Sequence, residues 1–250
     1  MDLGLSGKRS LVTGSSTGLG QAIAETLAAE GASVVVHGRD ASRAKAVAEH
    51  IRAGGGDAVS VTGDLTSDAG ADAVAATAGD IDIDILVNNA GQYDGLGWSE
   101  LTAERWAQIY QVNVVSGVRM IERLVPGMRR RGWGRVIQIG GGLAIQPVAM
   151  QPHYNATLAA RHNLTVSLAR ELAGTGITSN TVAPGVILTE PVRDMAISAA
   201  AATEWFPNDI GRFGRPDEIA YAVAFLASTQ AGYISGADLR VDGGTVRSVA

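Results

Sequence analysis

The sequence predicts a doubly wound α/β fold, a single domain in which helices cover both faces of a parallel sheet. Short apolar runs of strand length alternate along the chain with longer segments of helical pattern, as is typical of parallel strands joined by right-handed crossovers. A glycine-rich turn directly follows the first apolar run. The chain has 250 residues, of which 46% are hydrophobic, so it can bury one large core.

The glycine-rich turn reads TGSSTGLG at residues 13–20 and lies between a strand at 10–12 and a helix at 21–30. Gly14, Gly18 and Gly20 suit a tight turn, a close approach of the backbone to a pyrophosphate, and packing of the helix on the strand. The phosphates would lie at the positive end of the helix. Glycine is abundant, with 32 copies, so a purely structural turn is the alternative.

The rest of the first half continues the alternation. Residues 34–36 are three consecutive valines, as expected of a strand buried on both faces. Asp40 can cap the next helix, and the glycines at 54–56 can end it. The expected strands are 32–37, 58–61 and a segment from residue 83, and the expected helices are 40–53 and 68–78.

The second half repeats the pattern. We expect helices at about 102–130 and 152–173 and another opened by Pro216, with strands at 135–139, 178–182 and 238–241. Several prolines interrupt the segment before Pro216, which also contains an alanine-rich helical stretch. Such a segment is a candidate substrate lid, at about residues 186–212.

The composition argues against several other classes of protein. The 20 basic and 25 acidic side chains give a net charge of −5, and no basic run is long enough to follow a nucleic-acid backbone. There is no Cys, and the four His lack ligand spacing, so no metal site is expected. No stretch reaches the ~18 apolar residues of a membrane span, and no signal peptide is recognisable. We expect a soluble cytoplasmic protein with no nucleic-acid or membrane partner.

Motifs along almost the whole chain resemble those of the short-chain dehydrogenase/reductase family. They are TGSSTGLG at 13–20, Asp64 after the third strand, NNAG at 88–91, Asn113, Tyr154, Pro184 and Gly185 with Thr189 beyond, and GRPDEIA at 214–220. The resemblance implies a seven-stranded sheet in the order 3-2-1-4-5-6-7, with a nicotinamide nucleotide across the carboxyl ends of its strands. It also implies a homo-oligomer, either a dimer or a tetramer, paired through the helices at 102–130 and 152–173.

The resemblance also assigns site residues. Residues 14–20 would bind the pyrophosphate, Asp64 and Leu65 would flank the adenine, residues 89–91 would line the ribose, and Thr189 would contact the nicotinamide amide. The implied cofactor residues are Gly14, Ser15, Ser16, Thr17, Gly18, Leu19, Gly20, Arg39, Asp64, Leu65, Asn89, Ala90, Gly91, Tyr154, Pro184, Gly185, Ile187 and Thr189. The implied catalytic residues are Tyr154 and Asn113.

Arg39 bears on the choice of cofactor. Family members that prefer NAD usually carry an acid at the position of Gly38, whereas here that acid is missing and an arginine comes next. A guanidinium can bind a 2′-phosphate through two hydrogen bonds, which favours NADP(H), with NAD(H) still possible. The alternative is that Arg39 is a solvated surface residue.

Two active-site residues of the family are missing. The family combines a Ser, a Tyr and a Lys four residues after the Tyr, but here Gly141 takes the Ser position and Leu158 the Lys position. A cation ~4 Å from the phenol would interact by about 4 kcal/mol at an effective dielectric of ~20 and favour tyrosinate. Without it, Tyr154 should stay neutral at pH 7. A neutral phenol can donate a proton to a reduced carbonyl but cannot accept one from an alcohol, so reduction is favoured.

Three neighbouring features are candidates to compensate, and Asn113 is affected by the loss. Arg161 lies near the helical face of Leu158, and the alternatives are that it is directed inward or that it is a surface or interface residue. His153 projects about 100° around the helix from Tyr154, so it is a substrate-side or structural group. The N–H groups of residues 140–142 could bind a substrate oxygen or simply form a turn. Asn113 could instead bend its helix.

We therefore expect an NADP(H)-dependent reductase of a carbonyl group in a small or medium organic substrate, with the proton coming from Tyr154 or water. The alternative is a non-redox protein of the same fold. It would be a silenced oligomer partner, a ligand sensor, or an enzyme of elimination or isomerisation.

Overall fold

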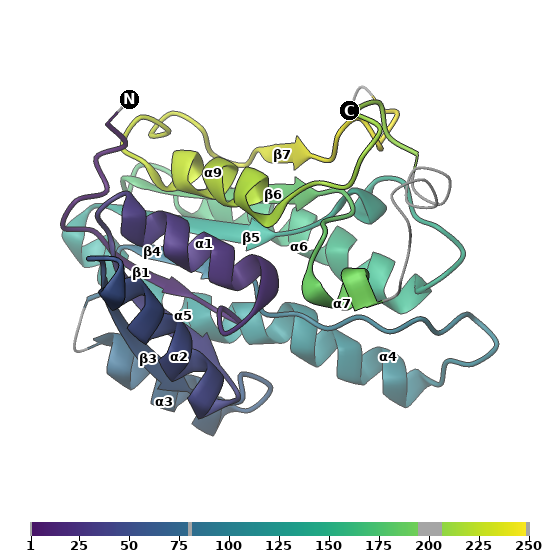
Figure 1. Cartoon of the computed structure of the whole chain (residues 1–250), viewed down its shortest axis with the longest axis horizontal. Coiled ribbons are helices and arrows are strands. Elements are labelled where there is room, and N and C mark those ends of the chain that lie inside the picture. The colour runs from purple at the N-terminus through teal and green to yellow at the C-terminus, as the bar shows by residue number, and fades with distance from the viewer. Residues whose placement is uncertain (1, 80–81, 195–206, 249–250) are drawn as a thin grey trace.

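A parallel sheet of seven strands forms the centre of the computed structural model, which describes residues 2–79, 82–194 and 207–248 (Figure 1). The strands lie in the order β3-β2-β1-β4-β5-β6-β7, and every neighbouring pair is parallel. Their bounds are β1 Arg9–Val12, β2 Ser33–Gly38, β3 Asp57–Thr62, β4 Ile85–Asn88, β5 Gly134–Ile139, β6 Ile177–Pro184 and β7 Asp238–Val241. This arrangement confirms the predicted fold class and strand order.

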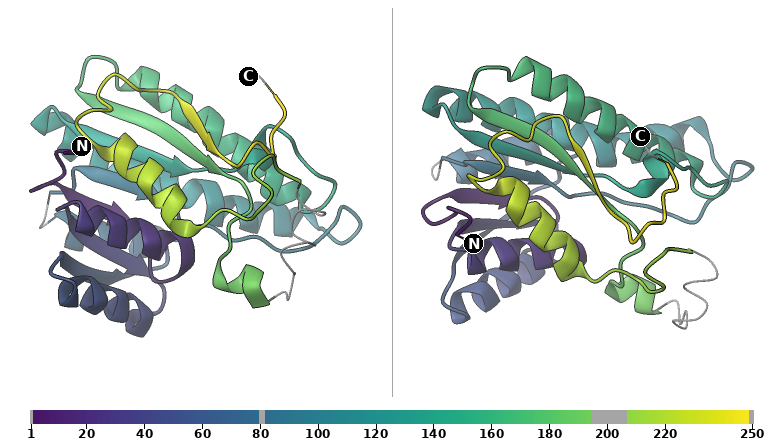
Figure 2. Two further views of the ribbon diagram at one scale, coloured as in Figure 1. Left: turned by 45° about the horizontal axis from the view of Figure 1, so that its top comes forward. Right: turned by 90° about the horizontal axis from the view of Figure 1, so that it is seen from above.

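Helices cover both faces of the sheet (Figure 2). One face carries α1 Gly18–Ala29, α2 Ala41–Ala53 and α9 Pro216–Ala227. The opposite face carries α3 Asp68–Gly79, α5 Ser116–Arg131 and α6 Pro152–Glu171. Two shorter helices are α4 Ala103–Tyr110, which packs against α6, and α7 Glu190–Asp194, which follows β6.

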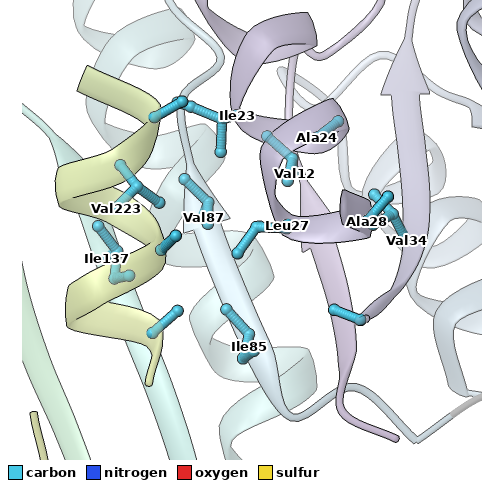
Figure 3. Packing of buried hydrophobic residues seen from close by; sticks show 14 of the residues in the cluster. Val12, Ile23, Ala24, Leu27, Ala28, Val34, Ile85, Val87, Ile137 and Val223 are labelled. Atoms are coloured by element: carbon cyan, nitrogen blue, oxygen red, sulfur yellow. The ribbon is translucent and has the colours of Figure 1, made fainter. Parts of the chain in front are cut away.

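The valine run of β2 explains why the sheet needs two helical layers. Val34 and Val36 belong to one buried cluster and Val35 to the other, because successive side chains of a strand point to opposite faces. Figure 3 shows the first cluster, in which Leu27 of α1 and Val223 of α9 lie over the strands of the sheet.

Carboxylates cap two of the helix starts, and the cap at Asp40 confirms the prediction from the sequence. The carboxylate of Asp40 accepts hydrogen bonds from the N–H groups of Ser42 (2.9 Å) and Arg43 (3.1 Å) at the start of α2. At the start of α9, the Glu218 carboxylate accepts from the N–H of Arg215 at 2.8 Å. Both carboxylates lie where the helix N-terminus favours negative charge.

The long helix expected at 102–130 is not one uninterrupted α-helix. A π-helical segment, η1 Gln111–Val115, separates α4 from α5 and contains the buried Asn113. A π-helical turn inserts one extra residue into the helix, and such turns are frequent at functional sites.

The expected lid lies only partly within the described residues. Its alanine-rich stretch falls between residues 194 and 207, which the structure does not describe. The two flanking segments meet in a parallel bridge between Ile187 and Gly214. Within the described part of the chain, no helix is long and apolar enough to cross a membrane.

Candidate active site

The predicted site residues gather along the edge where the parallel strands end. The glycine-rich turn follows β1, Arg39 follows β2, and residues 89–91 follow β4. Because β1 lies between β2 and β4, this edge includes the point at which the strand order reverses. In open α/β sheets, ligands bind in the crevice at that point.

The glycine-rich turn packs against the end of β4 with no space for side chains. A Cβ atom on Gly14 would lie 2.9 Å from Ala90 Cα, and one on Gly20 would lie 2.3 Å from the Gly14 carbonyl oxygen. Gly14 and Gly18 also adopt left-handed conformations, with φ of 65° and 58°, which favour glycine. Close contacts therefore require glycine at positions 14 and 20, and the backbone conformation favours it at position 18.

Hydrogen bonds join the glycine-rich turn to the segment that follows β4. Thr13 Oγ1 accepts from the N–H groups of Asn89 and Ala90, both at 3.0 Å. The side-chain amide of Asn89 donates to the carbonyls of Thr13 (2.9 Å) and Gly14 (3.0 Å). The Asn89 amide group thus supports the turn, which adds a structural role to the ribose contact expected of this residue.

The first turn of α1 is open to an anion. Its N-cap residue, Thr17, makes no side-chain capping hydrogen bond, so the N–H groups at this helix start have no competing side-chain acceptor. Ser15 is already engaged, because its hydroxyl donates to the Val12 carbonyl at 2.6 Å. Leu19 packs on the core beneath the turn. The residues present therefore fit a pyrophosphate at this position.

His37 supports the same turn, although sequence analysis treated it only as the end of a strand. The N–H of Gly14 donates to His37 Nδ1 at 3.0 Å, and His37 Nε2 lies 3.0 Å from the Gly63 carbonyl oxygen. This pattern requires a neutral ring with its proton on Nε2. Burial lowers the pKa of His37, while the Gly63 carbonyl and the Asp64 carboxylate oppose that shift.

The end of β2 has no space for an acidic residue. A Cβ atom on Gly38 would lie 2.6 Å from Ser16 Oγ and 2.7 Å from Ser16 Cβ. Arg39 follows and is exposed. Asp64 lies nearby: its pKa is lowered mainly by hydrogen bonds from Thr66, with a contribution from the Arg39 guanidinium. The neighbouring Leu65 side chain is buried in the core, so only its backbone can reach a ligand at this edge.

The segment after β6 reaches the glycine-rich turn through Thr189. Gly185 packs closely on β7, since a Cβ there would lie 2.9 Å from Asp242 Cα. Pro184 ends β6, and Ile187 is buried against the core. A Cβ on Gly18 would lie 3.9 Å from Thr189 Cγ2. Thr189 is therefore beside the glycine-rich turn, as its expected role requires.

Tyr154 lies in the first turn of α6, next to a second aromatic ring. The ring centroids of Tyr154 and Tyr93 are 5.9 Å apart. Burial raises the pKa of Tyr154, Tyr93 raises it further, and the positive charge of Arg161 opposes the shift. The phenol therefore keeps its proton at neutral pH, in line with the expectation from the missing lysine.

Gly141 and Leu158 are in direct contact. Leu158 is buried, and a Cβ atom on Gly141 would lie 3.0 Å from Leu158 Cδ1. A side chain at position 141 would require the leucine methyl group to shift slightly. Their contact makes this part of the site apolar.

The N–H groups of the glycines at 140 and 141 are already engaged within the protein. Gly140 donates to the Val182 carbonyl at 2.8 Å, and Gly141 donates to His162 Nε2 at 3.4 Å. His162 is in turn held by Asp238, whose carboxylate lies 2.9 Å from Nδ1. Of the three N–H groups that could bind a substrate oxygen, only that of Gly142 therefore remains a candidate.

Asn113 joins three segments rather than only bending a helix. Its side-chain amide donates to the Gln92 carbonyl (2.9 Å) and to Thr157 Oγ1 (3.0 Å), and its Oδ1 accepts from the Gln92 N–H at 2.7 Å. These bonds connect η1 to the loop after β4 and to α6. Asn113 thus positions the surroundings of Tyr154.

His153 is a structural group. It is fully buried, with Nε2 2.7 Å from an Asp94 carboxylate oxygen, and its ring packs edge-on against Trp106. Asp94 also pairs with Arg105 of α4. The group connects α4 to α6 and leaves no role for His153 as a replacement acid.

Arg161 is buried, so the surface alternative is wrong. Its Nε donates to the Asn113 carbonyl at 2.5 Å, its Nη1 donates to the Ile139 carbonyl at 2.6 Å, and its Nη2 donates to the Ala90 carbonyl. Burial lowers the pKa of Arg161 to about 10, which leaves it charged at neutral pH. Sequence periodicity placed Arg161 on the right face of the helix but could not identify these partners.

Comparisons with known proteins agree with this geometry. A family model described as short chain dehydrogenase matches residues 8–198. The uncharacterized oxidoreductase YvaG of Bacillus subtilis (strain 168) is 37% identical, covering all of both chains. The 3-oxoacyl-[acyl-carrier-protein] reductase FabG of Escherichia coli (strain K12) is 38% identical, over 95% of this chain and 97% of its own.

Solved structures of other proteins are also similar to this chain. A 3-oxoacyl (acyl-carrier-protein) reductase from Agrobacterium tumefaciens C58, with NADP bound, has a TM-score of 0.92 at 39% identity and covers 97% of this chain and 96% of its own. The L-sorbose reductase of Gluconobacter frateurii, in complex with NADPH and L-sorbose, has a TM-score of 0.93 at 34% identity over the whole of both chains.

The neutral state of His37 predicts a pH-dependent stability. Its pKa is lowered by folding, so its contribution is complete above about pH 6.5, the unfolded value, and is lost as the pH falls below it. Histidine titrates between about pH 5.5 and about pH 7.5. Over this range the free energy of unfolding, measured in urea, should therefore fall more in wild type than in His37→Asn. The exposed His50→Gln is the control and should behave as wild type; equal slopes in wild type and His37→Asn would refute the assignment.

Proposed function

The chain belongs to the short-chain dehydrogenase family of oxidoreductases, and from this premise we propose that it is an NADP(H)-dependent reductase of carbonyl compounds. The substrate would be a small or medium organic molecule. The observation that carries the proposal is the position of a protonated tyrosine, Tyr154, whose ring centroid lies 5.9 Å from that of Tyr93 in the loop after β4. The uncapped start of α1 follows the neighbouring strand β1. A proton donor would therefore lie at the same sheet edge as the residues proposed to bind the pyrophosphate.

The residues of this edge suit a nicotinamide nucleotide. Residues 14–20 would hold the pyrophosphate, the ends of β3 and β4 would hold the adenosine, and Thr189 would contact the nicotinamide amide. When bound, NADPH supplies the hydride that reduces the substrate carbonyl carbon. Tyr154 donates its phenolic proton to the carbonyl oxygen as negative charge develops there, and the resulting tyrosinate regains a proton from water.

Three observations support NADP(H) rather than NAD(H). Gly38 lies against Ser16 and has no room for the acid that would bind a free 2′-hydroxyl. Arg39 is exposed at the same edge and carries an always-charged group suited to a phosphate. Similar solved structures contain NADP or NADPH.

The apolar contact between Gly141 and Leu158 favours a second candidate function. If this contact closes the place where a substrate oxygen would bind, the chain would be a non-redox member of the family. It would then act as a silenced oligomer partner, a ligand sensor, or an enzyme of elimination or isomerisation.

Two further proposals concern the chain around this site. Residues 186–212 would act as a substrate lid, supported by the Ile187–Gly214 bridge, which holds the two ends of the segment together. The chain would also form a homodimer or homotetramer through the helices at 102–130 and 152–173, which are α4, α5 and α6. Apolar side chains left exposed on α4 and α6, such as Tyr110 (45%) and Val166 (38%), support that assembly.

The role of Tyr154 is testable by activity. Wild type should consume NADPH with some members of a panel of ketones and quinones, and Tyr154→Phe should lower kcat by about 10²- to 10⁴-fold because the proton donor is lost. Tyr93→Phe removes the neighbouring hydroxyl and should keep most of the activity. Tight NADPH binding without any turnover on the panel would instead support the non-redox alternative.

The role of Arg39 is testable by titration calorimetry. Arg39→Ala should weaken NADPH binding by about 1.5–3 kcal/mol, the usual worth of a hydrogen bond to a charged group, and leave NADH binding unchanged. Arg170→Ala, an exposed arginine of α6 far along the chain, is the matched control. A wild type that prefers NADH, or an Arg39→Ala variant with an unchanged preference, would rule out this role.

The assembly proposal is testable by light scattering. At micromolar concentration, the particle mass should be two or four times the 25.7 kDa of one chain. Val166→Glu should reduce the mass, because it would bury a charge in the interface. A wild-type mass equal to that of one chain would exclude the proposal.

A further inference from the structure

Arg161 is a buried cation without a carboxylate partner. Its side chain and backbone together are only 5% exposed. None of the carboxylates in residues 2–79, 82–194 and 207–248 forms an ion pair with it, and its three hydrogen bonds all go to neutral backbone carbonyls. A buried charge of this kind is costly. Carbonyl dipoles reduce that cost but leave the net positive charge in place.

The three carbonyls come from three separate segments of the chain. Ala90 follows β4, Asn113 lies in η1, and Ile139 ends β5. Each of three guanidinium nitrogens binds one of these segments, so the group is fixed in position and orientation. Arg161 lies two helical turns after Tyr154, and side chains on a helix tilt toward its N-terminus. The guanidinium is therefore directed back toward the turn that carries the phenol.

Tyr154 is the titratable group on which this charge acts. Among the described residues, Tyr154 is the titratable group whose charge interacts with Arg161, and the interaction favours the charged form of each partner. The other groups near the phenol do not replace this cation. Tyr93, from the loop after β4, disfavours tyrosinate. His153 of α6 and Arg105 of α4 are both held by the carboxylate of Asp94.

Leu158 lies between the two residues on the same helix face. Its side chain is buried, so this part of the helix face is apolar, and a low local dielectric strengthens the interaction between charges there. A lysine at this position would add a second buried cation close to Arg161. The leucine and the arginine therefore fit each other as a pair.

We propose that Arg161 is the positioning residue that supplies the positive charge at Tyr154, in place of the lysine that resembling proteins carry at the position of Leu158. The inference rests on the proposed reductase function. During reduction, the phenolic O–H bond breaks and its proton passes to the substrate oxygen, which leaves a tyrosinate. Arg161 stabilises that tyrosinate across the apolar contact with Leu158 and acts without touching the substrate.

The central experiment is a comparison of Arg161→Gln with wild type. Glutamine keeps N–H donors for the carbonyls but removes the charge. The tyrosinate absorbance of Tyr154, obtained by subtracting the titration of Tyr154→Phe, should move to higher pH in Arg161→Gln. The same variant should lose about tenfold in kcat for NADPH-dependent reduction, somewhat less than the loss of a direct oxyanion donor, with KM for the carbonyl substrate unchanged. Arg161→Lys should keep the wild-type midpoint.

A second-site variant separates charge from structure. Leu158→Lys alone should lower the melting temperature, since it adds a second buried cation. Leu158→Lys combined with Arg161→Gln should restore both the melting temperature and the wild-type tyrosinate midpoint. A purely structural arginine would not be replaced in this way. If Arg161→Gln does not fold alone, the combined variant carries the test by the same midpoint.

Two results would overturn the proposal: a tyrosinate midpoint equal in wild type and Arg161→Gln, or a combined variant that folds but does not recover the wild-type midpoint. The titration needs no turnover. An enzyme without reductase activity would therefore refute the proposed function while the midpoint still decides the role of Arg161.

Discussion

Close packing between the glycine-rich turn and the end of β4 is the constraint on which the rest of the site depends. The backbone of Gly14 lies so near Ala90 that no side chain fits between them, and Thr13 ties the same two segments together by hydrogen bonds. These contacts join neighbouring strands at the point where the sheet order reverses. Small residues let the exits of these two strands meet there, and in open α/β sheets this is the point at which ligands bind.

Hydrophobic periodicity was sufficient to predict the strands and the fold class, because strands buried on both faces are continuous apolar runs bounded by turn residues. The family resemblance supplied their order. The π-helical segment Gln111–Val115 could not be predicted in the same way. It depends on contacts of Asn113 with Gln92 and Thr157, which are distant in sequence, whereas local propensity favours a regular helix throughout.

In the candidate site, too, some features follow from the sequence pattern and others depend on contacts between distant segments. The expected cofactor residues follow the carboxyl ends of parallel strands. Because those ends lie at one edge of the sheet, the residues gather there without further contacts being needed to predict it. The role of His37 was not accessible, and Arg161 could be named only as one of two alternatives, because a histidine at a strand end and an arginine in a polar helix resemble many surface residues. What distinguishes them is burial against backbone groups of other segments, such as the Gly63 and Ile139 carbonyls. Only the assembled fold creates those partners.

Ala90 supports both halves of the site. Its N–H binds Thr13 beneath the glycine-rich turn, and its carbonyl accepts from Arg161 behind Tyr154. A ligand that tightens the turn would act on the residue that also binds the guanidinium. If nucleotide binding moves Ala90, nucleotide affinity and ionisation of the phenol would be thermodynamically linked, and each would then change the other by the same factor.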